Sequence, residues 1–419
     1  MTERPAAGDP ATAPDGGRPS SSMRASTRST LLGAMFLMAT SSIGPGFITQ
    51  TTTFTAQLGA AFAFAIVVSI VVDIALQLNV WRVIGVSGRR AQELGNLTLP
   101  GLGWVMAAFV LVGGLVFNVG NVSGAGLGTD AMLGLDPRVG GAVSAVIAIA
   151  IFLSKRAGVA MDRIVVVLGL VMIVLTVGIA VTSSPTVGEA LRNVVLPEEV
   201  SFLAITTLIG GTIGGYITFA GAHRLLDSGV SGPERVGDIT RSSVTGIVIT
   251  GVMRVVLFLA VLGVVAGAAT LASDNPPASA FEQAAGEVGL RVFGVVFWAA
   301  AITSVIGASY TSVSFITSRT RTSERTRTLL VVAFIVVTTT AFVVVGAAPA
   351  TLLVFAGAFN GLLLPLAIGV LLWVAWRRAD LLQGYRYPRA LLVVGALAWL
   401  LTLYLAVRSF GGVVGLFTG

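Results

Sequence analysis

Two short glycine-rich segments interrupt otherwise apolar stretches of the sequence. Residues 41–47 read Ser-Ser-Ile-Gly-Pro-Gly-Phe, and residues 210–216 read Gly-Gly-Thr-Ile-Gly-Gly-Tyr. Main-chain groups without helical hydrogen bonds are tolerated at membrane depth only where protein buries them or where they line a cavity. Half-helices that begin at such breaks present free amides and positive dipole ends, which suit a carboxylate. The matched pair of breaks predicts a solute site, and a transporter is the first hypothesis.

Hydroxyl and amide side chains near the breaks can orient a small polar molecule while Phe47 closes over its apolar part. The predicted binding set consists of Ser42, Gly44, Gly46, Phe47, Gln50, Asn118, Asn121, Thr212, Gly214, Gly215, Tyr216 and Asn360. Polar side chains of membrane helices also link neighbouring helices through hydrogen bonds. Both interpretations stay open for the amide side chains of the set, Gln50, Asn118, Asn121 and Asn360.

Three ionisable residues form a predicted ion-coupling set. Asp73 and Arg254 lie inside apolar stretches, where burial in lipid is expensive and usually serves a function. Asp73 is a candidate carrier of a coupling proton, and Arg254 can pair with it or complement an anionic substrate; a purely structural pair is the alternative. His223, the only histidine, joins the set because imidazole changes charge near neutral pH. A cap at the end of a helix is its alternative role.

The composition places most of the chain in lipid. The 419 residues are 55% hydrophobic and 11% charged, with a mean hydropathy of +0.92, which a soluble core with a charged shell does not have. The net charge of +7 does not indicate a nucleic-acid partner, because the arginines are spread between apolar segments. With no cysteine and one histidine, the parts of a catalytic, cofactor or metal centre are missing, so we expect no enzyme activity.

Apolar runs of about 20 residues predict eleven transmembrane helices. They cover residues 30–57, 60–81, 103–124, 139–154, 164–183, 202–223, 242–271, 289–316, 329–347, 351–376 and 390–408. Residues 1–28 are predicted to be a disordered cytoplasmic tail. The outer loops then receive only Arg138, Arg192, Arg291 and Arg408, and this excess of positive charge inside supports the helix count and the orientation. A single lysine beside many Arg, Val, Ala and Gly residues suggests GC-rich coding and a bacterial cell membrane.

The two breaks fall in the first and sixth predicted helices, so the chain divides into two comparable halves. Residues 29–184 and 202–376 each carry five helices, an external loop joins them at 185–201, and residues 377–419 add the eleventh helix. An odd number of helices per half turns the second half upside down relative to the first. The predicted fold is an all-α polytopic membrane protein with a 5+5 inverted repeat and one extra helix.

Several of these segments resemble one transporter family. Gly44-Pro45-Gly46, the broken sixth helix, the eleven-helix layout and residues 360–365 (Asn-Gly-Leu-Leu-Leu-Pro) are similar to the natural resistance-associated macrophage protein (NRAMP) family of proton-coupled divalent metal transporters. Residues 43–58, 73–92 and 217–229 look most like a divergent bacterial branch of it. The resemblance covers nearly the whole chain after the tail, and it implies a LeuT-type fold with the solute between the broken helices.

The resemblance fails at the residues that bind metal. The family's first-helix motif is Asp-Pro-Gly-Asn, and this chain has Gly44 at the acidic position and Phe47 at the amide position. The sixth-helix motif is Met-Pro-His, and the matching stretch is roughly 214–216, Gly-Gly-Tyr. Manganese and iron ions favour carboxylate and imidazole ligands, and a dehydrated dication at the midplane needs such groups. The departure therefore disfavours a bare transition metal.

The sequence thus predicts a secondary-active transporter for a small polar or anionic organic solute. The divergent branch is associated with genes for 5-oxoproline breakdown, so the resemblance implies a small carboxylate such as 5-oxoproline. The alternative is proton-coupled transport of a divalent metal (Mn, Fe or Mg), as in the parent family. Both H+ and Na+ stay open as coupling ions, because unwound carbonyls and nearby hydroxyls can hold Na+.

Overall fold

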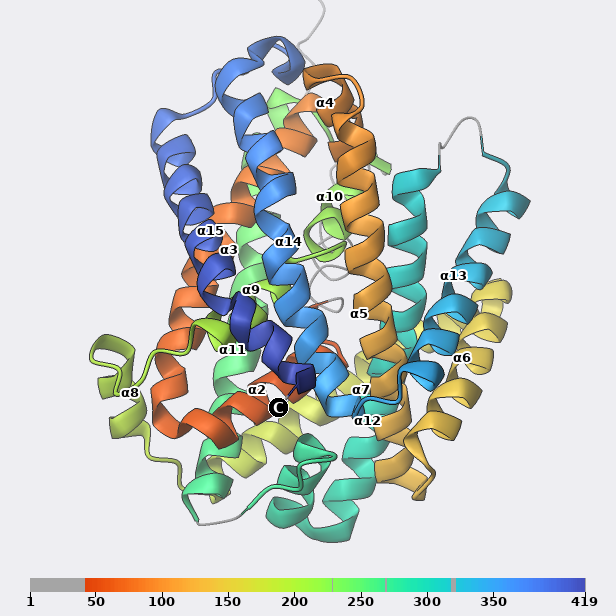
Figure 1. The fold of residues 1–419 in the computed structure, drawn as a ribbon, viewed down its shortest axis with the longest axis vertical. Coiled ribbons are helices and arrows are strands. Elements are labelled where there is room, and N and C mark those ends of the chain that lie inside the picture. Colours follow the sequence, from red (N-terminus) through yellow and green to blue (C-terminus); the bar gives the residue numbers. More distant parts are fainter. Residues whose placement is uncertain (1–41, 228, 268–269, 318–321, 419) are drawn as a thin grey trace, which may run out of the picture.

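The computed structural model describes residues 42–227, 229–267, 270–317 and 322–418, and within these ranges the chain is helical with short connections (Figure 1). The helices are α2 (Pro45–Leu58), α3 (Phe62–Ser87), α4 (Ala91–Thr98), α5 (Leu102–Leu133), α6 (Pro137–Leu153), α7 (Lys155–Thr182), α8 (Val187–Val195), α9 (Phe202–Ile213), α10 (Ile217–Asp227), α11 (Val236–Ala266), α12 (Pro276–Ile316), α13 (Glu324–Val345), α14 (Pro349–Arg377) and α15 (Arg389–Thr418). The predicted tail and the first part of the first predicted helix lie outside the described residues.

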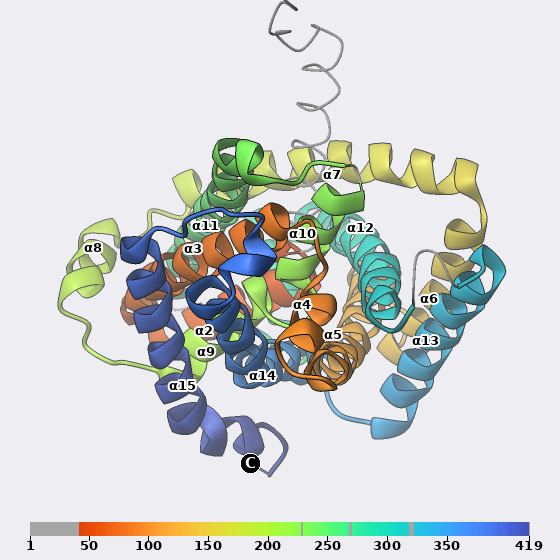
Figure 2. The ribbon, with the colours of Figure 1, turned by 90° about the horizontal axis from the view of Figure 1, so that it is seen from above.

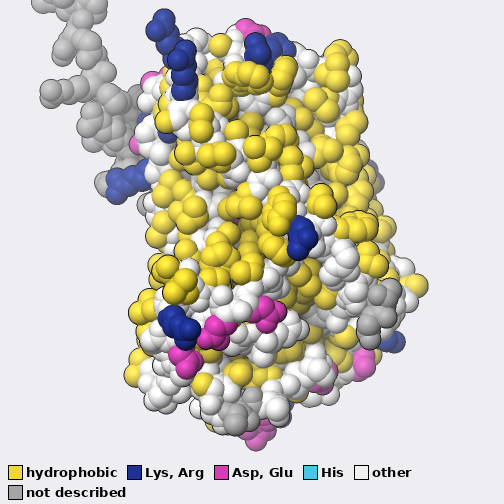
Figure 3. Space-filling view, turned by 60° about the vertical axis from the view of Figure 1, so that its left-hand side comes forward, with side chains coloured by type: hydrophobic (Ala, Val, Ile, Leu, Met, Phe, Trp, Pro, Cys, Tyr) yellow, Lys and Arg dark blue, Asp and Glu magenta, His cyan; other side chains and the backbone are white. Residues whose placement is uncertain are grey.

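Eight spans in the described part of the chain are long and apolar enough to cross a membrane. One of them, Pro45–Ser87, contains α2, a short 3-10 turn and α3, and it covers the later part of the first predicted helix and the whole of the second. Helix α6 is a shorter apolar helix, and α7 forms with α8 a pair bent by 100°. The helices are therefore consistent with the eleven predicted spans. Figure 3 shows the broad apolar surface that they present on one face, with few charged side chains in it.

Local capping groups explain where several helices begin. The side chain of Asp136 accepts hydrogen bonds from the main-chain amides of Arg138 and Val139, and Pro137 occupies the first turn of α6. Ser323 caps α13 in the same way. Helix α12 begins 13 residues before the predicted span at 289 and contains a non-helical residue, Gly286. The prediction missed this first part because its residues are too polar to extend an apolar run.

The two interrupted spans lie at the centre of the molecule. Seen from above, α2, α9 and α10 occupy the middle, and α7, α13 and α15 lie at the periphery (Figure 2). Helix α2 packs against α9, α11, α12 and α14 of the second half and against α3 and α5 of the first. This arrangement buries the first break among helices from both halves of the chain.

Helices α9 and α14 touch through their main chains. A Cβ atom on Gly210 would lie 2.0 Å from the carbonyl oxygen of Gly357 and 2.2 Å from the amide nitrogen of Gly361. On Gly361 it would lie 2.4 Å from the carbonyl oxygen of Thr206. Small residues permit such close approach of membrane helices, and van der Waals contact then stabilises the pair. These glycines hold the second break against α14.

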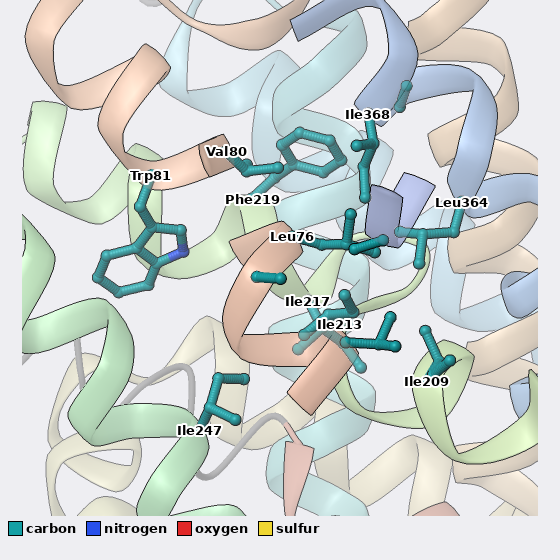
Figure 4. Packing of buried hydrophobic residues seen from close by; sticks show 14 of the residues in the cluster. Leu76, Val80, Trp81, Ile209, Ile213, Ile217, Phe219, Ile247, Leu364 and Ile368 are labelled. Carbon is teal, nitrogen blue, oxygen red and sulfur yellow. The ribbon is translucent and has the colours of Figure 1, made fainter. Parts of the chain in front are cut away.

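Apolar side chains surround the second break on the other side. Ile213 and Ile217 flank the break and are fully buried, and Leu76 of α3 packs in the same cluster. Figure 4 shows these side chains with Leu364 and Ile368 of α14. Burial of this apolar surface fixes the ends of α9 and α10 relative to α3 and α14.

Candidate functional site

The first break leads directly into α2. Gly44 precedes the helix with extended backbone (φ −98°, ψ −171°), no side chain caps the helix, and Pro45 occupies its first turn. The start of α2 therefore carries main-chain amides and the positive end of the helix dipole without a carboxylate beside them in the chain. The acidic position of the NRAMP motif is Gly44, so the protein keeps the break and lacks the acid.

The second break separates α9 from α10 at residues 214–216. Gly215 has φ +55°, a left-handed conformation that glycine adopts without steric cost. A Cβ atom there would also lie 2.3 Å from Oδ1 of Asn360, so the site leaves no room for a side chain. The three residues thus interrupt the helix within the single span Phe202–Asp227, as the glycine pattern predicts.

Thr212 joins the two breaks. Its main-chain carbonyl accepts a hydrogen bond of 2.9 Å from the Ser42 hydroxyl, and its own hydroxyl accepts one of 2.9 Å from Nη1 of Arg254. The Thr212 hydroxyl in turn donates to the carbonyl of Leu208. Residues from α9, α11 and the lead-in to α2 therefore meet at one point.

Arg254 is the buried cation of this site. Its side chain is 1% exposed, and the guanidinium carbon lies 4.4 Å from the ring centroid of Phe47. Nε and Nη2 have no hydrogen-bond partner in the structure. A guanidinium stacked on an aromatic face with free N–H groups is arranged to bind a planar anion through two parallel hydrogen bonds.

Asp73 supplies the opposite charge from α3. Its carboxyl group is fully buried and is attracted by Arg254. Neither carboxyl oxygen has a hydrogen-bond partner, and among the described residues no ion pair within 4.0 Å includes Asp73. The two predicted ion-coupling residues are thus neighbours in the fold without an ion pair, and the Thr212 hydroxyl, which accepts from Arg254, also faces Asp73.

Two amide side chains of the predicted binding set take part in helix packing. Gln50 donates to the carbonyl of Leu353 at 2.9 Å and lies against Gly211 and Gly357. Asn360 donates to the carbonyl of Gly113 at 3.0 Å. Each nevertheless keeps an amide oxygen without a hydrogen-bond partner. Both residues therefore stabilise the packing around the breaks and also carry an acceptor there.

The asparagines of α5 differ from each other. Asn118 donates to the hydroxyls of Ser309 and Thr338, which makes it a link between α5, α12 and α13. Asn121 has no hydrogen-bond partner at either amide atom and lies near the hydroxyl of Tyr216. The Tyr216 ring is fully buried and packs edge-on against Phe117. Asn118 thus keeps only its amide oxygen without a partner, whereas Asn121 keeps its whole amide beside the second break.

His223 lies away from Asp73 and Arg254. Its ring is 4% exposed, packs against Phe219 and Phe315, and makes no hydrogen bond. Helix α10 continues for four residues to Asp227, so His223 does not cap it. The structure therefore places this third member of the predicted ion-coupling set in an aromatic environment.

Trp81, which was not predicted from the sequence as a site residue, links α3 to the second half-helix. Its indole nitrogen donates to the carbonyl of Thr218 at 2.9 Å, directly after the break. A signal was present, because positions 73, 77 and 81 fall on one face of α3 at a spacing of four residues. Trp81 thus continues the face that carries Asp73.

The described residues hold no cluster of three or more His, Cys, Asp or Glu side chains that fits a metal ion. The groups at the two breaks are hydroxyls, amides, carbonyls and the Arg254 guanidinium, and the Asp73 carboxyl of α3 lies near the guanidinium. Such a donor set, with a fixed cation in it, suits an anion better than a dication.

Comparison with known proteins places the chain in a family. A family model described as natural resistance-associated macrophage protein-like matches residues 35–411. The uncharacterized membrane protein YcsG of Bacillus subtilis strain 168 is 54% identical over 374 residues, which are 89% of this chain and 92% of that protein. An uncharacterized membrane protein of Haemophilus influenzae is 50% identical over 382 residues, 91% of this chain and 95% of that protein.

Solved structures confirm the fold. The Eremococcus coleocola manganese transporter, in complex with an aromatic bis-isothiourea compound, superposes with a TM-score of 0.76 at 18% identity, covering 97% of this chain and 90% of that chain. MhsT in complex with L-phenylalanine gives a TM-score of 0.64 at 14% identity, covering 90% and 97%. The chain therefore belongs to the natural resistance-associated macrophage protein-like family, and it is a multi-pass membrane transporter with a LeuT-like fold.

Proposed function

We propose that the protein is a secondary-active transporter for a small organic carboxylate, bound between the two breaks. The observation that carries the proposal is the buried guanidinium of Arg254, which stacks on Phe47 and keeps Nε and Nη2 free. A carboxylate that accepts two hydrogen bonds from these nitrogens would satisfy donors that are otherwise left unpaired in a low-dielectric site.

Electrostatics argue against a divalent metal at the same place. Two unit charges about 4 Å apart interact by roughly 4 kcal/mol at an effective dielectric constant of 20, and a dication doubles this repulsion. The carboxylate that offsets such a cost in the NRAMP motif is replaced by Gly44. A monovalent anion instead gains from the same guanidinium.

The polar groups around Arg254 suggest the kind of carboxylate. Gln50 and Asn360 each offer a free amide oxygen, and Asn121 offers a whole amide. These groups can pair with a polar N–H and C=O on the solute, while Phe47 covers an apolar part. A small acid that carries an amide, such as 5-oxoproline, has all of these features. The remaining predicted contacts at Ser42, Gly46 and Gly214 would supply a hydroxyl and main-chain groups.

We also propose the orientation and location that the arginine distribution favours. The N-terminus would lie in the cytoplasm, and the protein would lie in the inner membrane of a bacterium. In this orientation the halves 29–184 and 202–376 form the two inverted repeats, and α2 and α9 point from the breaks toward the outside.

Uptake into proteoliposomes tests the proposal against its main alternative. Purified protein is reconstituted, a proton gradient is imposed, and uptake of Mn2+ is compared with that of a panel of small carboxylates that includes 5-oxoproline, with and without Na+. We expect saturable uptake of a carboxylate and none of Mn2+. Saturable Mn2+ uptake without carboxylate uptake would establish proton-coupled metal transport, as the fold of the manganese transporter suggests, and would overturn the proposal.

The Arg254→Gln variant tests the role of the guanidinium in this assay, and Arg408→Gln is its matched control. It keeps a planar polar side chain and removes the charge, so we expect carboxylate uptake to fall to the level of empty vesicles. Arg408→Gln removes an arginine that stacks on Phe202 and belongs to the predicted outer loops. That variant should transport like the wild type.

A further inference from the structure

We propose that Asp73 binds the coupling proton, and that it shares Arg254 with the carboxylate of the solute so that one proton crosses the membrane with each solute molecule. This inference rests on the proposed function, and it adds the coupling ion, its ligand and the stoichiometry. It is carried by two buried, oppositely charged groups on the packed helices α3 and α11, which make no ion pair among the described residues and have Thr212 as a common neighbour.

The surroundings of Asp73 leave Arg254 as its charged neighbour. Helix α3, which carries Asp73, packs against α2, α8, α9, α10, α11, α14 and α15. From α11 the charge of Arg254 acts on Asp73, and from α9 the Thr212 hydroxyl faces it. Within the described part of the chain, no other charged side chain on these helices acts on Asp73. The charge state of Asp73 is therefore linked to whatever Arg254 binds.

Arg254 cannot neutralise the carboxylates of both Asp73 and the solute at the same time. Nη1 already donates to Thr212, and only Nε and Nη2 are free. A solute carboxylate that takes both free nitrogens removes the compensation on which a charged Asp73 depends. Proton binding to Asp73 then restores neutrality, because the proton joins one carboxyl oxygen and the guanidinium keeps its charge.

The net charge of the site explains why the solute and the proton are transported together. The empty site holds one carboxylate and one guanidinium, and its net charge is zero. The fully loaded site holds a protonated Asp73, the guanidinium and the solute carboxylate, and its net charge is again zero. A site with only the solute or only the proton carries one net charge, which is costly at membrane depth. The two neutral states are thus the ones that can reorient.

This charge balance gives a distinctive transport behaviour. Transport of one proton with one monovalent anion moves no net charge, so a pH gradient drives accumulation and a membrane potential does not. A gradient of one pH unit drives accumulation of up to about tenfold at equilibrium, since each tenfold ratio corresponds to one unit. Sodium is not required.

The test uses the full-length protein in proteoliposomes and radiolabelled 5-oxoproline as the probe. For the wild type we expect accumulation under an inward proton gradient, and no change in initial rate when valinomycin sets a potassium diffusion potential. Uptake that follows the diffusion potential, or that requires Na+, overturns the proposal. Absence of saturable uptake of any carboxylate in the panel overturns the proposed function, and the coupling proposal with it.

The Asp73→Asn variant separates coupling from binding. It should still exchange external for internal 5-oxoproline in the absence of a gradient, but lose the accumulation of up to about tenfold that a gradient of one pH unit drives in the wild type. Asp130→Asn is the matched control, because Asp130 is an acid of α5 whose carboxyl accepts from Asn275; it should accumulate the probe like the wild type. Proton-driven accumulation by Asp73→Asn at the wild-type level overturns the proposal.

A double variant covers the case in which Asp73→Asn fails to fold because Arg254 loses its counter-charge. Asp73→Asn combined with Arg254→Gln removes both charges, so its melting temperature should recover. It should neither bind 5-oxoproline nor accumulate it. Accumulation by a folded double variant contradicts the shared role of the two residues.

Discussion

The hydroxyl of Ser42 donates a hydrogen bond of 2.9 Å to the main-chain carbonyl of Thr212, and so joins two breaks that lie 170 residues apart in the sequence. On the same residue, the Thr212 hydroxyl accepts from Arg254. A change at either break therefore alters the hydrogen bonds that hold the buried guanidinium of Arg254.

Replacing Thr212 by valine keeps the shape of the side chain and removes the acceptor of Arg254. A lost hydrogen bond to a charged group costs roughly 1.5–3 kcal/mol, so we expect the apparent affinity for the carboxylate to fall by about tenfold or more. Thr250→Val is the control, because Thr250 lies on α11 and bonds only within its own helix, to Gly246. Competition uptake in proteoliposomes measures both variants, and equal losses in the two would contradict a special role for Thr212.

Replacing Arg254 by lysine keeps the charge and removes the planar fork. The ammonium cannot donate two parallel hydrogen bonds to one carboxylate. We expect KM for the carboxylate to rise by about tenfold or more while proton coupling persists, because the positive charge still balances Asp73. Initial rates over a range of solute concentrations check this. A wild-type KM in the lysine variant would show that the guanidinium does not hold the solute through two bonds.

Placing an acid at the start of α2 should add a negative charge that competes with the solute carboxylate for Arg254. In Gly44→Asp the new carboxylate stands one turn before Phe47, on which Arg254 stacks. We expect carboxylate uptake to be lost, and Mn2+ uptake to appear only when Gly44→Asp is combined with Arg254→Gln. Gly44→Asn has the same size without the charge and serves as control. Unimpaired carboxylate uptake by Gly44→Asp would place the solute elsewhere.

Substituting alanine for Gly215 should destabilise the protein without touching the guanidinium. The residue has φ +55°, and the new methyl group would meet Oδ1 of Asn360 at 2.3 Å. We expect a loss of roughly 1–3 kcal/mol, seen as a lower melting temperature in detergent. Gly307→Ala, at a helical position with nothing within 4 Å of the new methyl, is the control. Equal melting temperatures for the two variants would contradict this account of the turn.

Much of this architecture could be predicted because glycine, proline and apolar runs act locally. The second break falls at 214–216, inside the predicted segment 210–216, since Gly215 sits at a position that needs a left-handed residue. The longer α12 could not be predicted from hydropathy, because its first part is held by tertiary contacts and by the Asn275 cap and is not an apolar run.

The residues of the candidate site could be predicted from the sequence, but the hydrogen bonds between them could not. Hydrogen bonds such as those from Gln50 to Leu353 and from Arg254 to Thr212 join residues far apart in sequence, and no local pattern encodes them. The packing role of Asn118 depends on Ser309 and Thr338 in other helices. The departure from the metal motif at Gly44 and Phe47, in contrast, could be seen from the residues alone.

The glycine contacts between α9 and α14 bear on how such a molecule would move. Main chains that touch at Gly210, Gly357 and Gly361 cannot slide past each other by a helical turn without larger atoms colliding. We therefore expect α9 and α14 to travel as one rigid body. The bending that opens one side of the membrane and closes the other would then be concentrated in the three residues 214–216, which act as the hinge of the inner half-helix.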